Sequence, residues 1–138
     1  MIKPKVLFLC TTNSCRTQMA EGILRQIAGD RFEITSAGAD PAPIDAEAMV
    51  AMKEIGIDIS RQAPKDMGQF LGQRFTYVIS LCDRHEERTC PIFPGAVWRH
   101  VWPMEDPSTA RSQAEHRALV RRLRDHIQNR VLEFSNQN

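Results

Sequence analysis

The chain has 138 residues, of which 25% are charged and 42% hydrophobic, and its basic and acidic side chains leave a net charge of +1. A chain of this length predicts one domain, residues 1–138, that buries roughly two-thirds of its extended surface. The balanced charge argues against nucleic-acid binding, and without a signal-peptide pattern or an apolar stretch near ~20 residues we expect a cytoplasmic protein outside the membrane.

The first half of the chain begins with an apolar run, residues 5–9, that predicts a short buried strand. From Thr17 onward, apolar side chains recur at helical spacing until Gly29 provides a stop. A second strand is expected at residues 32–36, where β-branched and aromatic side chains return. Strand and helix therefore alternate from the start.

After a proline-rich loop, Asp45 is a suitable cap for a helix that ends at Gly56. Residues 66–71 predict another short helix. The clearest strand of the sequence follows at residues 75–81, which are apolar and β-branched with little charge.

A fourth strand is expected at residues 97–102, and a long helix at about 112–134 completes the chain. The buried stripe of this helix is predicted to be Ala114, Ala118, Leu119, Leu123, Ile127, Val131 and Phe134.

Strands that alternate with helices predict an α/β fold of three layers, with a four-stranded parallel sheet between helices on both faces. Ligands of such sheets bind beyond the carboxyl ends of the strands. Cys10, Ser36, Cys82 and the segment after Trp102 all follow a predicted strand. We therefore expect them to meet at one edge of the sheet.

Cys10 and Arg16 enclose a five-residue loop at the first strand-to-helix junction. The enclosed residues are Thr11, Thr12, Asn13, Ser14 and Cys15. Free N–H groups at a helix start, the helix dipole and a guanidinium fork together predict a pocket for a tetrahedral oxyanion. The same field should lower the pKa of the Cys10 thiol below about 8.5, and Thr17 offers a hydroxyl to the thiolate.

The Cys10–Arg16 spacing alone is equally compatible with a buried cysteine and a solvated arginine, and its placement at the junction favours the site. Four cysteines in a chain without an export signal favour reactive or reduced thiols over structural disulfides, and their spacing matches no zinc site. We interpret Cys15 as a spectator thiol. The polar segment between Cys82 and Cys90 is expected to be an exposed, mobile loop, unless it is a solvated loop that holds two cysteines by chance.

Six motifs follow one another along almost the whole chain: CTTNSCRTQMAE from Cys10, SAG from Ser36, GIDIS from Gly56, ISLC ending at Cys82, CP at Cys90 and DP at Asp106. Together they resemble the thioredoxin-coupled arsenate reductases, which are built on the low-molecular-weight protein tyrosine phosphatase fold. That family commonly has glycine where this chain has Thr12, so we expect a slightly reshaped loop.

The resemblance implies that the Cys10 thiolate attacks arsenate while the loop and Arg16 neutralise the oxyanion and Asp106 donates a proton as general acid. Cys82 would then attack Cys10 and release arsenite. Cys90 would next attack Cys82 and leave a Cys82–Cys90 disulfide for thioredoxin to reduce. Phosphate and sulfate would mimic arsenate.

The resemblance implies no required cofactor, but it points to a potassium ion at Asn13, Glu21 and Ser36. The alternative is a hydrogen-bond network of the same three side chains that braces the loop. Asn13 and Ser14 are expected to hold the loop's shape rather than to take part in chemistry.

Two other functions compete with arsenate reduction. A phosphatase of the same fold would use Cys10, Arg16 and Asp106 but would leave Cys82 and Cys90 without a role, although weak phosphatase activity fits either enzyme. A thiol redox sensor would use the two loop cysteines and leave Arg16 and Asp106 unexplained. Asp106 alone also fits a turn or a helix cap. A monomer is the base expectation.

Overall fold

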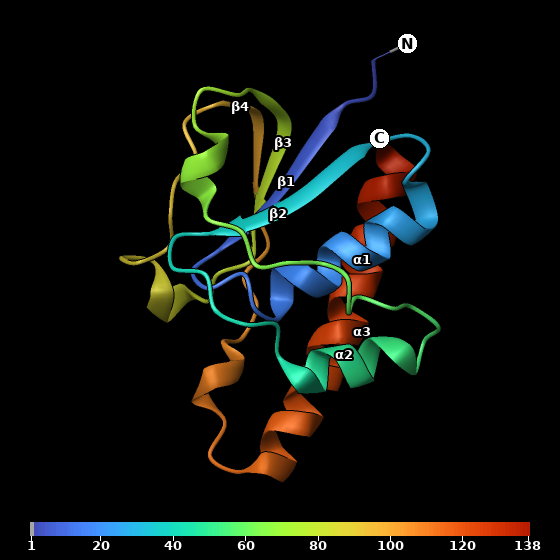
Figure 1. Cartoon of the computed structure of the whole chain (residues 1–138), viewed down its shortest axis with the longest axis vertical. Helices are drawn as coiled ribbons and strands as arrows, with labels where there is room; N and C mark the ends of the chain where they lie inside the picture. Colours follow the sequence, from blue (N-terminus) through green and yellow to red (C-terminus); the bar gives the residue numbers. More distant parts are fainter. Residues whose placement is uncertain (1) are drawn as a thin grey trace.

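The computed structural model describes residues 2–138, which contain the predicted four-stranded parallel sheet (Figure 1). The strands are β1 (Lys5–Cys10), β2 (Glu33–Gly38), β3 (Phe75–Ser80) and β4 (Ala96–Val101). They lie in the order β2-β1-β3-β4, and each neighbouring pair is parallel. The chain moves outward from β1 to β2 and then crosses to β3 on the other side of β1. This reversal of strand order places a crevice beyond the ends of β1 and β3.

Three α-helices connect or follow these strands. They are α1 (Arg16–Ala28), α2 (Ala46–Lys53) and α3 (Gln113–Gln137). Three short 3₁₀ helices lie in the loops, and they are η1 (Met67–Phe70), η2 (Arg84–Glu86) and η3 (Pro107–Thr109). Asp45 caps α2 as predicted, because its side chain accepts a hydrogen bond from the backbone N–H of Glu47.

The two faces of the sheet are covered differently. Val6 and Phe8 point into a core shared with all three α-helices, whereas Leu7 and Leu9 point into a second, smaller core. The second face is covered by η1 and by the segment around Phe93 (Figure 1). The third layer is therefore thin, because the helix on that face is the short η1 and the β3–β4 connection carries only the short η2.

The buried stripe of α3 differs from its predicted pattern at the start of the helix. Ala114 and Ala118 are exposed, and Val120 is buried instead. The first turns of α3 extend beyond the sheet, so they have no core to pack against (Figure 1). From Leu119 to Phe134 the predicted apolar positions are buried.

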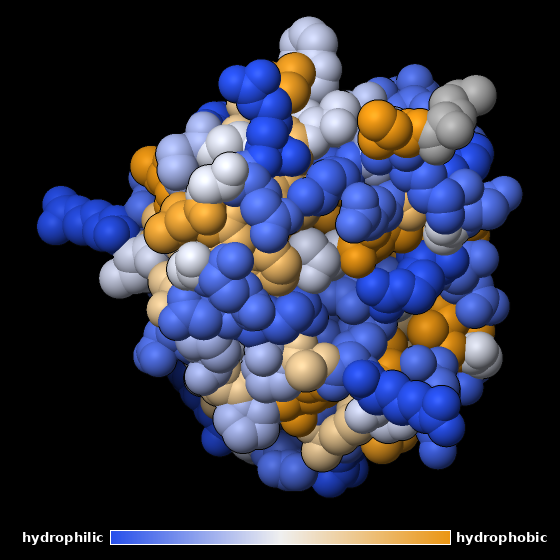
Figure 2. Space-filling view, turned by 45° about the horizontal axis from the view of Figure 1, so that its top comes forward, coloured by the Kyte–Doolittle hydropathy of each residue, from blue (hydrophilic) through white to orange (hydrophobic). Residues whose placement is uncertain are grey.

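The molecular surface is mostly hydrophilic on the face drawn in Figure 2, where apolar side chains form small separate patches. The largest fully buried side chains include Phe8, Phe75 and Phe93. Among residues 2–138, no helix combines the length and the hydropathy that a membrane crossing would need.

Candidate active site

The loop between β1 and α1 forms one wall of a cleft of about 410 Å³. Cys10 is the last residue of β1 and Arg16 is the first of α1, and both are buried. The carbonyl groups of Thr11, Thr12 and Ser14 accept hydrogen bonds from the backbone N–H groups of residues 40, 42 and 45. The residues that follow these carbonyl groups, Thr12, Asn13 and Cys15, line the cleft, and their N–H groups point away from these bonds because the C=O and N–H of a trans peptide point in opposite directions.

Asn13 fixes the curvature of this loop. Its backbone has a φ of 52°, a left-handed conformation that asparagine tolerates better than most residues. Its side-chain amide donates to Thr17 Oγ1 and Ser36 Oγ at 2.9 Å each, and its Oδ1 accepts from the backbone N–H of Lys65 at 2.8 Å. Among the described non-glycine residues Asn13 alone has a positive φ, so Thr12 occupies the usual glycine position without backbone strain.

Gly38 supports the loop from the neighbouring strand. A Cβ atom at this position would lie 2.8 Å from the carbonyl oxygen of Thr11 and 2.9 Å from the backbone nitrogen of Asn13. Only a residue without a side chain allows this approach, so Gly38 of the SAG motif has a structural reason.

Asn13, Glu21 and Ser36 lie together, and their side chains are hydrogen-bonded to one another. Asn13 directs its NH₂ group rather than its oxygen at Ser36, and Ser36 Oγ donates to Glu21 Oε1 at 2.6 Å. Lys65 Nζ lies 3.4 Å from the same carboxylate, and Arg25 pairs with its second oxygen at 2.9 Å. These contacts form a hydrogen-bond network in which two cations, Lys65 and Arg25, face the single carboxylate of Glu21. The ion stays an untested prediction, and no step below depends on it.

Arg16 lies where three strands end. Its guanidinium donates to the carbonyl oxygens of Leu81, directly after β3, and Met104, after β4, at 3.3 Å each. Its closest partner is Glu86, whose two oxygens lie 2.6 and 3.1 Å from Nη1 and Nη2. Asp106 Oδ1 is farther away, at 3.9 Å from Nη2.

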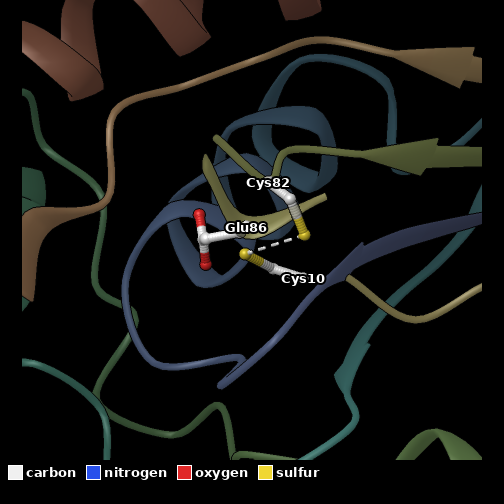
Figure 3. Close-up of side chains that lie close together, drawn as sticks. All are labelled: Cys10, Cys82 and Glu86. Atoms are coloured by element: carbon white, nitrogen blue, oxygen red, sulfur yellow. Dashed lines mark hydrogen bonds between the residues drawn. The ribbon is translucent and has the colours of Figure 1, made fainter. Parts of the chain in front are cut away.

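The relay cysteines are arranged around the end of β3. Cys82 Sγ lies 3.9 Å from Cys10 Sγ (Figure 3). Cys82 is also joined to Cys90 by a disulfide, while Cys10 and Cys15 are free thiols. Cys82 therefore lies between Cys10 and Cys90, as a two-step relay requires.

The sequence left open whether Asp106 caps a helix or belongs to the active site, and the structure shows it in both positions. Its Oδ1 caps η3 by accepting from the backbone N–H of Ser108 at 3.0 Å. Its carboxylate also lines the cleft, and its Oδ2 lies 3.8 Å from His85 Nε2. Capping thus holds the carboxylate at the site rather than excluding a role in it.

The loop from Cys82 to Cys90 is exposed in part only. Arg84 and His85 are exposed as expected, but Glu86 is buried, with 7% of its surface accessible. Sequence reasoning missed Glu86, because an acidic residue in a charged loop is usually solvated. Only its position halfway between two cysteines could have drawn attention to it.

The pKa of the Cys10 thiol is raised to about 11, so the predicted lowering is wrong for this state. Burial is the largest cause, Arg16 opposes it, and the Glu86 carboxylate adds to it. The prediction counted the guanidinium but neither the burial of the thiol nor the carboxylate that pairs with Arg16. Burial also raises the pKa of the Cys15 thiol, which agrees with a spectator role.

A cysteine at the switch point of a parallel sheet, beside an arginine and the backbone of a strand-to-helix loop, defines a class: enzymes that direct a sulfur nucleophile at a tetrahedral oxyanion. Residues 5–137 match the low molecular weight phosphotyrosine protein phosphatase family, and the chain belongs to that family.

Several proteins with similar sequences or structures are named arsenate reductase. An arsenate reductase of Halalkalibacterium halodurans is 41% identical, over 98% of this chain and 97% of its own length. A structure of an arsenate reductase in the phosphate binding state is 29% identical with a TM-score of 0.73, covering 94% of this chain and 98% of that one. The thioredoxin-dependent arsenate reductase of Corynebacterium glutamicum is 28% identical with a TM-score of 0.74, covering 98% of this chain and 61% of that one.

Proposed function

We propose that this chain is an arsenate reductase that takes two electrons from its own thiols and is reduced again by thioredoxin. One observation carries the proposal: Cys10 Sγ lies 3.9 Å from Cys82 Sγ, and Cys82 is bonded to Cys90. A phosphatase of this fold needs the first cysteine alone. The relatives named arsenate reductase, which match nearly the full length, support the same choice.

In the first step the Cys10 thiolate bonds to arsenic, and one arsenic–oxygen bond breaks. The departing group is a hydroxyl of the arsenate, and Asp106 gives it one proton, so that it leaves as water. The loop N–H groups and Arg16 balance the charge of the remaining oxygens. This step changes no oxidation state.

In the second step the Cys82 thiolate attacks Cys10 Sγ, and a Cys10–Cys82 disulfide forms. The electron pair of the sulfur–arsenic bond stays on arsenic, which passes from the +5 to the +3 state and leaves as arsenite. Cys90 then attacks Cys82, Cys10 departs as thiolate, and a Cys82–Cys90 disulfide remains for thioredoxin. The structure has the disulfide expected at the end of this cycle.

The competing functions fit the residues less well. A redox sensor needs neither the buried arginine nor a carboxylate at the cleft. Phosphate ester hydrolysis as a weak side activity follows from the shared loop and fold. Our proposal further includes inorganic phosphate and sulfate as mimics of the substrate, a monomeric state and a cytoplasmic location, where a thiol relay has its reductant.

The proposal is tested by a single turnover. Fully reduced protein is mixed with one equivalent of arsenate without thioredoxin, arsenite is quantified, and disulfides are mapped by mass spectrometry. We expect about one arsenite per chain and a Cys82–Cys90 disulfide. Arsenate left unchanged by the reduced thiols would contradict the proposal.

A further inference from the structure

Glu86 occupies the donors that an oxyanion would use. Its carboxylate accepts hydrogen bonds from the two terminal nitrogens of the Arg16 guanidinium, Nη1 and Nη2. Thr11 Oγ1 also donates to Glu86 Oε2, at 3.2 Å. Figure 3 shows this carboxylate beside the Cys10 and Cys82 sulfurs, with which it forms a buried cluster. A carboxylate and a tetrahedral oxyanion both present two oxygens to a guanidinium, so they compete for the same fork.

The loop holds Glu86 in this place through its backbone and its disulfide. Asp83 and Glu86 form a reciprocal capping box around η2, in which the backbone N–H of Asp83 donates to Glu86 Oε1 at 2.7 Å. The backbone N–H of Cys90 donates to the Glu86 carbonyl oxygen at 2.7 Å. The Cys82–Cys90 bond closes the ring that contains these contacts and so reduces the freedom of the loop to leave the cleft.

We propose that Glu86 is an internal ligand of the oxyanion pocket, which closes the pocket in the Cys82–Cys90 disulfide form and leaves it when the disulfide is reduced. The proposal rests on the proposed relay, which creates this disulfide at the end of each cycle. In the disulfide form the Glu86 carboxylate replaces the departed anion on Arg16 until thioredoxin has acted.

The electrostatics of the cleft favour this exchange. A buried guanidinium needs a negative partner, and Arg16 is 4% exposed. With Glu86 in place the site is balanced, so a second anion would be repelled at the same fork. The Glu86 carboxylate also disfavours the Cys10 thiolate, since it contributes to the raised pKa of that thiol. The oxidised form is thereby closed to phosphate and keeps Cys10 protonated.

A permanent salt bridge is the competing explanation, and phosphate binding separates the two. Inorganic phosphate is titrated calorimetrically into the full chain, either reduced with a thiol or oxidised with diamide, with the Cys82–Cys90 bond verified by mass mapping. We expect oxidation to weaken phosphate binding by at least about tenfold. Equal affinity of the two forms overturns the proposal.

The matched variants are Glu86→Gln and Glu87→Gln, which remove the same charge from neighbouring positions of one loop. Glutamine retains the acceptor of the capping box, so the loop keeps its fold. Oxidised E86Q should bind phosphate within about threefold of the reduced wild type, whereas oxidised E87Q, altered at an exposed residue, should remain as weak as the oxidised wild type. Weak binding by oxidised E86Q, with an unchanged melting temperature, overturns the proposal.

A second readout follows Cys10 itself. In the oxidised protein at fixed pH, iodoacetamide should alkylate Cys10 faster in E86Q than in E87Q, because removing the Glu86 charge favours the thiolate. Equal rates in the two variants count against the proposal. Neither assay contains arsenate, so a failure of arsenate reduction would be seen separately in the single-turnover experiment.

Discussion

The partner that binds the Arg16 guanidinium affects the charge near the Cys10 thiol. The guanidinium contacts carbonyl groups at the ends of two strands and has one carboxylate directly on its fork. If an oxyanion uses the same two nitrogens as Glu86, as we propose, the charge that Cys10 experiences depends on which of them is bound. Glu86, which is distant in sequence, thus contributes to the pKa of Cys10, after burial and Arg16.

Asp106→Asn tests proton donation at the scale of one atom. Asparagine still accepts the hydrogen bond of Ser108 and preserves the cap, so the loss is confined to the proton. We expect the single-turnover rate of arsenite formation to fall by roughly 100- to 10,000-fold, the usual range for general acid catalysis.

Glu105→Gln is the control for this change, because Glu105 is the exposed neighbour of Asp106 and loses the same charge. Its single-turnover rate should match that of the wild type. A normal rate for Asp106→Asn would show that another group, such as solvent, supplies the proton.

The loop of residues 82–90 is the element that distinguishes this chain from a simple phosphatase. One of its ends faces the nucleophile, since Cys82 Sγ lies 3.9 Å from Cys10 Sγ. Its other end, Cys90, contacts Ser80 at the end of β3, with 3.2 Å between the sulfur and Ser80 Oγ. Between them, residues 84–89 are exposed apart from Glu86. One short element thus connects a closed pocket to the surface.

Cys90→Ser tests the relay at the scale of this loop. Without the last thiol, arsenate should convert the protein to a Cys10–Cys82 disulfide that does not move further outward. Mass mapping after one turnover should find that bond, and thioredoxin-driven turnover should be lost.

Arg88→Ser changes an exposed residue of the same loop and should leave turnover intact. If Cys90→Ser still turned over at the wild-type rate with thioredoxin, the second resolving step would be unnecessary and the relay as written would be wrong.

At the scale of the whole molecule, the parallel sheet assembles the site from distant segments. Arg16 and Glu86 are 70 residues apart in sequence, and Arg16 and Met104 are 88 apart. The helices on one face of the sheet fix these distances, with α3 closing the core through Phe134, which packs against the rings of Phe32 and Tyr77.

Phe134→Ala should therefore destabilise the fold. Removing this buried ring is expected to lower the free energy of unfolding by about 3–5 kcal/mol, measured by urea denaturation. Leu132→Ala on the same helix is the control, because Leu132 is 41% exposed and its truncation should cost less than about 1 kcal/mol. If Phe134→Ala lowered the free energy of unfolding as little as Leu132→Ala is expected to, the end of α3 would not be part of the core.

Local patterns were enough to predict the strands, the helices and the Cys10–Arg16 loop. Strand periodicity, the Asp45 cap and the strand-to-helix junction depend on residues that are close in sequence, so the sequence contains their causes. The strand boundaries differ from the prediction by one or two residues, and the segment at 66–71 became the 3₁₀ helix η1. Ala114 and Ala118 were misplaced because periodicity does not show where the core ends.

The sequence by itself determined where the strands and helices form, and that the ends of parallel strands bring Cys10, Cys82 and Asp106 to one edge of the sheet. Only the tertiary structure decided which side chains at that edge contact one another. The placement of Glu86 on Arg16, and the raised pKa of Cys10 that goes with it, depend on burial and on charges brought together through space. Such interactions have no period and no fixed spacing along the chain, so only the packing of the folded molecule determines them.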